Sequence, residues 1–203
     1  IRGAAISPAS SRTRSCARGA AGRSRLQAAG IADGPILVLA PGAAYGPAKQ
    51  WGPERFAAVG ARAARARDLR LVIVGAAADL EAAGETARIA AASGARVANL
   101  AGATTLSELA GVLAAASAVV ANDSGVMHLA AALGRPTVGV FGSTSPVWTA
   151  QASPWVANLY AEYPCSPCFR RTCPIGYGCL RSIEAEQGVT ALERLLAGTA
   201  GSR

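Results

Sequence analysis

The stretch AVVANDSGVMHLAAAL, residues 118–133, decides the fold of this chain. It begins with a short apolar run that contains two β-branched valines, and it passes through the polar turn NDSG. Apolar residues then continue at a spacing typical of a helix. We therefore predict a buried strand, a tight turn and a helix. The first turn of that helix contains His128, the only histidine of the chain.

The polar turn in this stretch is a candidate anion site. A helix N-terminus presents unpaired backbone N–H groups and a partial positive charge, so it readily binds a phosphate. Ser124 and Gly125 suit this position, because a hydroxyl can cap a helix and glycine lets a ligand approach the backbone. The alternative is that Asp123 or Ser124 only caps the helix and His128 has an ordinary structural place.

Short apolar strands and amphipathic helices alternate along the rest of the chain. The strands are expected at 36–40, 69–74, 97–100, 118–121, 137–141 and 156–160. The helices are expected at 53–67, 79–92, 105–115, 126–133 and 184–197. This alternation predicts an α/β fold, a Rossmann-like doubly wound parallel sheet with helices on both faces. Ligands bind beyond the carboxyl ends of such strands, where loops 41–52, 75–79, 122–125 and 142–148 converge.

The charge of the chain is distributed unevenly. The formal net charge is +8, but residues 1–30 hold six arginines and no acid. The remainder is nearly neutral and has no basic stripe with interleaved aromatic residues, which argues against a nucleic-acid partner. No apolar run reaches the roughly 18 residues that a transmembrane segment needs.

The composition also suggests where the domain begins. Residues 1–30 are rich in arginine and serine, and we predict a disordered or non-native leader there. A transit peptide is one alternative, and a misjudged reading frame or a truncation is another. Residues 31–203 are predicted to form one domain, with a cysteine-rich loop at 163–180 and the C-terminal helix at 184–197.

Loop 41–52, PGAAYGPAKQWG, contains the only lysine of the chain, Lys49. A compact ammonium charge at the carboxyl end of a strand suits a phosphate or a leaving oxygen. The loop is not a P-loop, and no strand is followed by G-x-G-x-x-G, which disfavours a dinucleotide dehydrogenase. Asp79, after the second strand, can reach ribose hydroxyls, although an acid at a helix start also complements the helix dipole.

Four cysteines form a C-x2-C-x4-C-x5-C pattern, with members Cys165, Cys168, Cys173 and Cys179. Thiols this close fit a structural zinc site or an iron–sulfur cluster. Two disulfides or four reduced thiols are the alternatives. A Ser124–His128 dyad for hydrolysis is geometrically conceivable, but the G-x-S-x-G motif is absent.

Five segments together resemble the bacterial lipopolysaccharide heptosyltransferases, most closely the type II enzymes. They are PGAAYGPAKQW (41–51), NLAGATTLSELAGVLAAAS (99–117), NDSGVMHLAAALGRP (122–136), GVFGSTSP (139–146) and CSPCFRRTCPIGYGCL (165–180). The resemblance covers about residues 34–197. It implies the C-terminal, donor-binding half of a GT-B glycosyltransferase, in which two Rossmann-like domains face each other across a cleft.

The resemblance also implies a reaction. An inverting enzyme would transfer L-glycero-D-manno-heptose from ADP-heptose to the inner core of lipopolysaccharide, at heptose I of Kdo2–lipid A. It would act in the cytoplasm at the inner membrane and need no cofactor for catalysis. The acceptor half and its general base are expected to be missing here, so the chain would bind donor but transfer weakly. The alternatives are another ADP- or UDP-sugar GT-B transferase and a non-catalytic nucleotide- or metal-binding module.

By position, Lys49 resembles the family lysine that contacts the donor phosphate and stabilises the leaving group. Asp123 resembles the aspartate that holds the heptose, and the amides of Ser124 and Gly125 would meet the diphosphate. His128 resembles a histidine near the diphosphate and sugar. Two further parts of the donor are assigned to Asp79, near the adenosine, and to Thr104 or Thr105, near the base.

Overall fold

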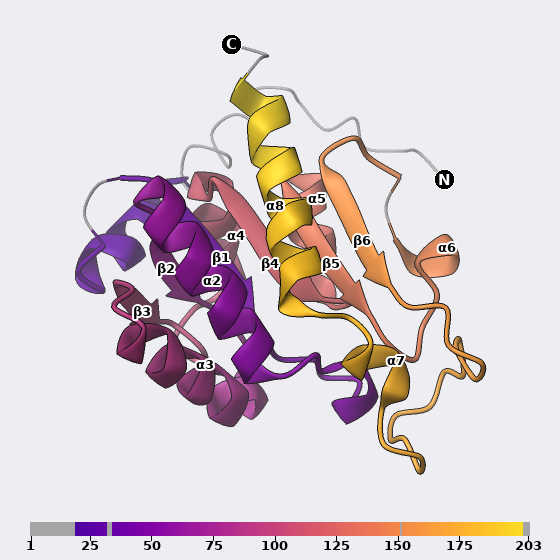
Figure 1. The fold of residues 1–203 in the computed structure, drawn as a ribbon. Helices are drawn as coiled ribbons and strands as arrows, with labels where there is room; N and C mark the ends of the chain where they lie inside the picture. The colour runs from indigo at the N-terminus through magenta and orange to yellow at the C-terminus, as the bar shows by residue number, and fades with distance from the viewer. Residues whose placement is uncertain (1–18, 32–33, 151, 201–203) are drawn as a thin grey trace, which may run out of the picture.

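The computed structural model describes residues 19–31, 34–150 and 152–200 of the chain, which form an α/β domain around one parallel sheet (Figure 1). The sheet has six strands in the order β3-β2-β1-β4-β5-β6, and every neighbouring pair is parallel. The strands are β1 (Ile36–Ala40), β2 (Arg70–Ile73), β3 (Val97–Asn99), β4 (Ala118–Asn122), β5 (Thr137–Phe141) and β6 (Val156–Tyr160).

In the middle of the sheet β1 pairs with β4. From β1 the strands continue to β2 and β3 on one side, and from β4 they continue to β5 and β6 on the other, so the strand order reverses between β1 and β4. This is the order of a Rossmann-like domain, and such a reversal opens a crevice at the carboxyl ends of the two central strands. The predicted doubly wound parallel sheet is therefore confirmed, including the strand at 156–160.

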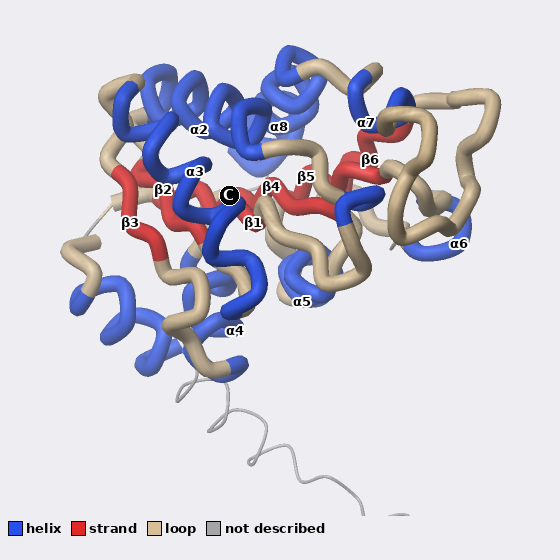
Figure 2. The backbone as a smooth tube through the Cα atoms, turned by 90° about the horizontal axis from the view of Figure 1, so that it is seen from below, coloured by secondary structure: helices blue, strands red, loops and turns tan. Residues whose placement is uncertain are grey.

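Helices cover both faces of the sheet (Figure 2). Three long helices, α2 (Pro53–Arg67), α3 (Leu80–Ala92) and α8 (Ala185–Ala200), pack on one face. The other face is covered by α4 (Leu106–Ala115), α5 (Gly125–Ala132) and a helical segment at 19–28. Four short elements lie in the connections, namely η1 (Pro47–Lys49), η2 (Ala77–Asp79), α6 (Pro146–Thr149) and α7 (Gly178–Arg181).

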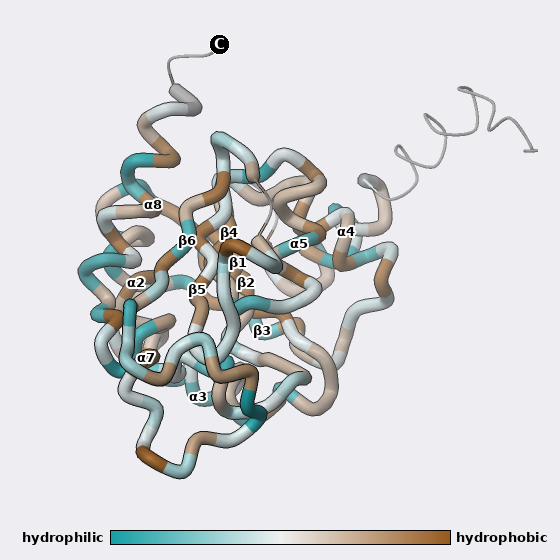
Figure 3. Tube along the Cα trace, turned by 90° about the vertical axis from the view of Figure 1, so that its right-hand side faces the viewer, coloured by the Kyte–Doolittle hydropathy of each residue, from teal (hydrophilic) through white to brown (hydrophobic). Residues whose placement is uncertain are grey.

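The central strands are almost entirely apolar, with Asn122 at the end of β4 an exception, and both of their faces are buried. In β1, Leu37 and Leu39 contribute to the core under α2 and α8, whereas Ile36 and Val38 contribute to the core under α4 and α5. This double burial explains why the strands have continuous apolar runs without polar alternation. In Figure 3 the strongly hydrophilic positions lie mainly at the periphery of the trace. No helix in the described part of the chain is long and apolar enough to cross a bilayer.

The prediction of a disordered leader over 1–30 is wrong for its second half. Residues 19–28 are helical, and Leu26 and Ile31 are buried in the core under α4. A Cβ atom on Gly22 would lie 2.2 Å from the carbonyl carbon of Gly111, so this helix packs on α4 with backbone against backbone. The abundance of arginine hid these few packing residues. Residues 1–18 lie outside the described residues, so for them the disordered leader stays a prediction.

Candidate functional site

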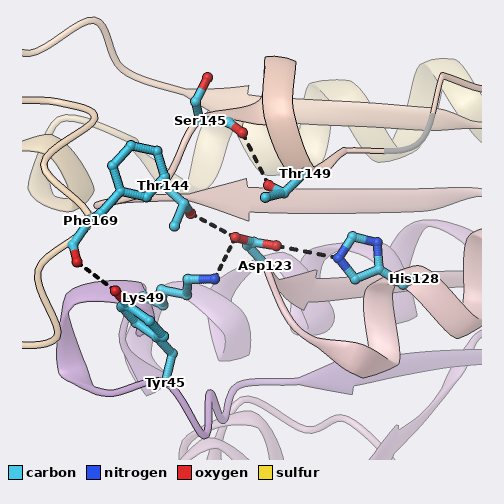
Figure 4. A network of polar contacts seen from close by, with 8 residues as sticks. All are labelled: Tyr45, Lys49, Asp123, His128, Thr144, Ser145, Thr149 and Phe169. Atoms are coloured by element: carbon cyan, nitrogen blue, oxygen red, sulfur yellow. Dashed lines mark hydrogen bonds and ion pairs between the residues drawn. The ribbon is translucent and has the colours of Figure 1, made fainter.

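The site lies at the carboxyl ends of β1 and β4, where Ala40 pairs with Ala121 in the sheet. The loop after β1 brings Lys49 to the turn after β4, and the Lys49 Nζ atom lies 2.7 Å from Oδ2 of Asp123 (Figure 4). Asp123 is only 3% exposed, so this is a nearly buried ion pair. Two predicted site residues, 74 positions apart in the chain, are thus brought into direct contact.

Asp123 is held by groups from two loops and from helix α5. Besides Lys49, the Thr144 hydroxyl donates a 2.6 Å hydrogen bond to Oδ2, and the His128 Nε2 atom lies 3.5 Å from Oδ1. Sequence reasoning missed Thr144, which follows β5 in one of the four converging loops. Each of these groups can donate a hydrogen bond to the Asp123 carboxylate, so together they fix its orientation. Asp123 therefore does not act only as a cap of α5.

Ser124 is the N-cap residue of α5, but its hydroxyl makes no capping hydrogen bond. Its Oγ atom is buried and has no hydrogen-bond partner among the described residues. The predicted capping role of this hydroxyl is therefore wrong. The Ser124–His128 dyad is not formed either, so the hydrolase alternative loses its geometric support. A buried hydroxyl without a partner is costly, and a helix N-terminus offers amides that lack intrahelical partners, so Ser124 at the start of α5 is a candidate ligand contact.

Asn122 fixes the loop that carries Lys49. Its buried side chain accepts a 3.1 Å hydrogen bond from the Trp51 amide and donates a 2.6 Å bond to the Pro41 carbonyl. The loop is therefore tied at both of its ends to the last residue of β4. Sequence reasoning quoted Asn122 only as part of the polar turn. The signal for its role was a polar amide at the end of a fully apolar strand, where a buried amide must find partners.

Tyr45 places a ring beside the lysine. The Lys49 Nζ atom lies 4.7 Å from the centroid of the Tyr45 ring, a cation–π contact, and the Tyr45 hydroxyl donates to the Phe169 carbonyl. The amide of Ala48 donates a 3.0 Å bond to the Arg171 carbonyl. The cysteine-rich loop therefore packs directly on the lysine loop, a long-range contact that no local sequence pattern predicts.

A groove of about 510 Å³ opens on the other side of the α5 N-terminus. It has a volume typical of small-molecule sites. Four predicted donor-binding residues line it, namely Asp79, Thr104, Ser124 and Gly125. The remaining lining is small or apolar and consists of Ala40, Gly42, Ala43, Ala44, Val74, Gly75, Ala76, Leu106, Leu109, Val126 and Leu129.

Asp79 lies against the backbone at the bottom of this groove. Its carboxylate accepts a 2.8 Å hydrogen bond from the Ala76 amide. A Cβ atom on Gly42 would lie 2.0 Å from the Asp79 Cγ atom, so only glycine fits at that position. The aspartate thus closes the gap between the loops after β1 and β2.

Thr105 does not line the groove. It is the N-cap of α4 and forms a reciprocal capping box with Glu108. The Thr105 amide and the Thr105 hydroxyl both donate to the Glu108 carboxylate. These bonds, the amide's having the larger effect, hold the pKa of that carboxyl below its ordinary value. The structure therefore places Thr104 in the groove and Thr105 in the helix cap.

The four cysteines do not form the predicted metal centre. Across 19–31, 34–150 and 152–200, no group of three or more histidine, cysteine or acidic side chains is arranged to hold a metal ion. The Cys173 sulfur accepts the Tyr177 amide at 3.2 Å, which lowers the pKa of its thiol. Burial raises the pKa of Cys179, whose side chain packs into the core. Cys165 is exposed and Cys168 is half-buried, and all four thiols are free.

The fold and the site together define a class of protein. A Rossmann-like sheet with a groove at its switch point is common to nucleotide-binding domains, and here it matches about half of each of two solved GT-B glycosyltransferases. Within that class, the chain belongs to glycosyltransferase family 9, the heptosyltransferases, whose family model matches residues 7–177.

Individual relatives agree with this assignment. The chain is 32% identical over 166 residues to lipooligosaccharide heptosyltransferase 2 of Campylobacter jejuni, which covers 79% of this chain and 51% of the relative. The solved structure of ADP-heptose lipopolysaccharide heptosyltransferase II from Escherichia coli matches with a TM-score of 0.72 at 26% identity, over 97% of this chain and 54% of that one. The chain spans about half the length of the curated relatives it matches.

One solved relative is described as an iron-containing protein. The dodecameric heptosyltransferase TibC, solved with ADP-D-beta-D-heptose, matches with a TM-score of 0.64 over 81% of this chain and 46% of its own. Its identity to this chain is 19%, so the likeness concerns the fold alone. The iron belongs to that protein, and in the described part of this chain the four cysteines are free and form no metal-binding group.

Proposed function

We propose that this chain is the donor-binding half of an inverting heptosyltransferase. It binds ADP-L-glycero-D-manno-heptose, and the complete enzyme transfers the heptose to heptose I of Kdo2–lipid A in the lipopolysaccharide inner core, at the cytoplasmic face of the inner membrane. The observation that carries the proposal is the buried Lys49–Asp123 pair beside the α5 N-terminus and the groove. Family membership supports the reaction type.

The donor lies across the α5 N-terminus, with its nucleoside on one side and its sugar on the other. The adenosine enters the groove, where Asp79 approaches the ribose and Thr104 approaches the base. The diphosphate meets the backbone amides at Ser124 and Gly125, because a helix N-terminus attracts phosphate. The unpartnered Ser124 hydroxyl supplies one more donor there.

The sugar end of the donor meets the polar network. Asp123 accepts hydrogen bonds from the heptose hydroxyls, and His128 lies beside both the sugar and the diphosphate. Lys49 then has two partners available, Asp123 and the β-phosphate. As the bond to the heptose breaks, negative charge grows on the leaving ADP, and a preorganised lysine stabilises that charge.

The proposal assigns leaving-group stabilisation to protein groups and requires no metal ion for this step. Tyr45 and Thr144 hold Lys49 and Asp123 in place before the donor arrives, so little reorganisation is needed. The general base that activates the acceptor hydroxyl is not among the residues assigned here. We therefore expect donor binding by this chain and weak transfer at most.

The first test is the affinity for ADP of the wild type and of Lys49→Ala, measured by calorimetry. Removing a charge-assisted contact to phosphate is expected to cost about 2 kcal/mol, roughly a thirtyfold weaker affinity. Arg67→Ala is the matched control, because Arg67 is an exposed cation at the far end of α2. Equal ADP affinity in wild type and Lys49→Ala would refute the proposed phosphate contact.

A second titration separates the proposed donor from other nucleotide sugars. The chain is expected to bind ADP-heptose more tightly than a UDP-sugar, because the groove is proposed to fit the adenine base. Preference for the UDP-sugar would assign the chain to another GT-B specificity. Failure to bind either nucleotide at millimolar concentration would leave no support for a donor-binding role.

A further inference from the structure

Two aromatic side chains form an exposed stacked pair next to the site. Trp148 of α6 and Phe169 of the cysteine-rich loop have ring centroids 5.4 Å apart with an interplanar angle of 29°. Trp148 is 76% exposed and Phe169 is 40% exposed, and the neighbouring Val147 is also exposed. Large apolar side chains gathered in the open mark a surface that binds something. We call Trp148 and Phe169 the aromatic platform.

The aromatic platform is anchored to the lysine site. The Phe169 amide donates a 2.8 Å hydrogen bond to the Ser143 carbonyl, and its own carbonyl accepts from the Tyr45 hydroxyl (Figure 4). Ser143 precedes Thr144, whose hydroxyl bonds to Asp123. The Phe169 amide is therefore linked through Ser143 to Thr144, which binds Asp123. The Phe169 carbonyl is linked through the Tyr45 ring to Lys49. The platform is a fixed extension of that site.

Two arginines, Arg170 and Arg171, directly follow Phe169 in the chain. The Arg171 guanidinium lies 5.4 Å from the centroid of the same Tyr45 ring that contacts Lys49, and both Arg170 and Arg171 are exposed. Neither arginine forms an ion pair with a carboxylate among the described residues. Between positions 139 and 183 the sequence holds three arginines and a single acid, Glu162. Uncompensated guanidinium groups favour carboxylate or phosphate ligands.

We propose that Trp148, Phe169 and Arg171 bind an anionic saccharide, the acceptor, on the side of the site opposite to the nucleoside groove. This inference rests on the proposed function. The open face of the Trp148 ring stacks on the C–H face of a pyranose, and Arg171 pairs with a carboxylate or phosphate of the same sugar chain. The donor half of the enzyme thereby contributes directly to acceptor recognition.

The position of the platform favours a saccharide over a membrane surface as the ligand. An acceptor sugar must approach the donor where ADP leaves, and Tyr45 connects the platform to that point through Lys49. A bilayer contact has no need of this connection. Nor would it require Arg171 to lie over the Tyr45 ring beside Lys49.

The test uses the full chain and a defined probe, the phosphate-bearing inner-core oligosaccharide freed of its lipid by deacylation. Binding is measured by ligand-detected NMR for the wild type, Trp148→Ala and Arg171→Ala. Each variant is expected to bind the oligosaccharide about tenfold more weakly than the wild type. Enzymatic dephosphorylation of the probe is expected to weaken binding to the wild type and to reduce the effect of Arg171→Ala.

Two control variants match the tested side chains. Trp155→Ala removes another exposed tryptophan, at the amino end of β6 beside the start of β5, and Arg67→Ala removes another exposed arginine. Both are expected to bind the oligosaccharide like the wild type. Equal binding by Trp148→Ala, Arg171→Ala and the wild type overturns the proposal, as does a wild type that does not bind the probe at millimolar concentration.

Two further measurements separate the explanations. ADP titration of the same samples reports on the donor site: oligosaccharide binding without ADP binding refutes the proposed function, whereas ADP binding without oligosaccharide binding refutes only this inference. Sedimentation with phosphatidylglycerol vesicles tests the membrane alternative. Vesicle binding that Trp148→Ala abolishes, with unchanged oligosaccharide binding, would assign the platform to the bilayer and overturn the inference.

Discussion

The two sides of the α5 N-terminus are built in different ways. On one side, the Lys49–Asp123 pair is nearly buried and held by hydrogen bonds from Thr144 and by a ring contact from Tyr45. On the other side, the groove has few polar groups and is lined mostly by small or apolar residues. The polar side is preorganised for charge, and the groove is preorganised for shape. Under the proposed function, one helix start would therefore separate the groups that act on the leaving phosphate from the groove that recognises the nucleoside.

The largest effect is expected from Asn122→Ala, which should break the polar side. The variant leaves the Trp51 amide and the Pro41 carbonyl buried without partners, which is expected to lower the free energy of unfolding by about 3 kcal/mol. Urea unfolding measures this loss. Asn158→Ala, at an exposed position of β6, is the matched control and should change stability little. A loss equal to that of the control would show that the lysine loop is held by other contacts.

A smaller effect is expected from Leu106→Ala, which changes only the groove. Leu106 is 75% exposed, so its truncation should leave the free energy of unfolding within about 0.5 kcal/mol of the wild type. A bound adenosine would cover this side chain, so ADP affinity should fall by about 1 kcal/mol, roughly fivefold. Calorimetric titration of ADP gives the affinity, and Leu80→Ala removes another exposed leucine as a control. Identical ADP affinities for both variants would place the nucleoside outside the groove.

Thr105→Ala sharpens the comparison at the rim of the groove, because it affects stability and not binding. Loss of the α4 cap is expected to lower the free energy of unfolding by about 1 kcal/mol, with unchanged ADP affinity. A weaker ADP affinity of Thr105→Ala would instead show that Thr105 contributes to donor binding.

The same variant has a defined pH dependence. The folded pKa of Glu108 lies below its ordinary value of 4.5, so the stability that its carboxylate provides is complete above that pH. It is lost as the pH falls through the lower folded pKa. The stability difference between wild type and Thr105→Ala should therefore narrow below pH 4.5, which unfolding curves in the acidic range can measure. A constant difference would contradict the assigned partnership.

The strand pattern was sufficient to predict the fold, because strands buried on both faces leave continuous apolar runs. The six strands and the five long helices all lie within three residues of their predicted bounds, and four of them have both bounds as predicted. The helical segment at 19–28 was missed for a physical reason. Its burial depends on Leu26, Ile31 and a glycine contact, and so few apolar residues give no periodic signal among many arginines.

The site was predictable only in part. Lys49, Asp123 and Ser124 could be singled out, because a lone lysine and a polar turn both followed apolar strands. The contacts with Tyr45 and Phe169 could not, since they depend on how the cysteine-rich loop packs on the lysine loop 124 residues away. The spacing of the four cysteines predicted a shared ligand, yet their sulfur atoms lie in different environments, from exposed to core.

The pairing of β1 with β4 also has a consequence for the kinetics of folding. Asn122 and Pro41 are 81 residues apart in the chain, and Lys49 and Asp123 are 74 residues apart. Contacts over such long separations slow folding, because closing a long loop costs entropy before any contact rewards it. The candidate site therefore depends on long-range contacts rather than on local ones. Recovery of ADP binding after refolding would report when the last central strand has paired.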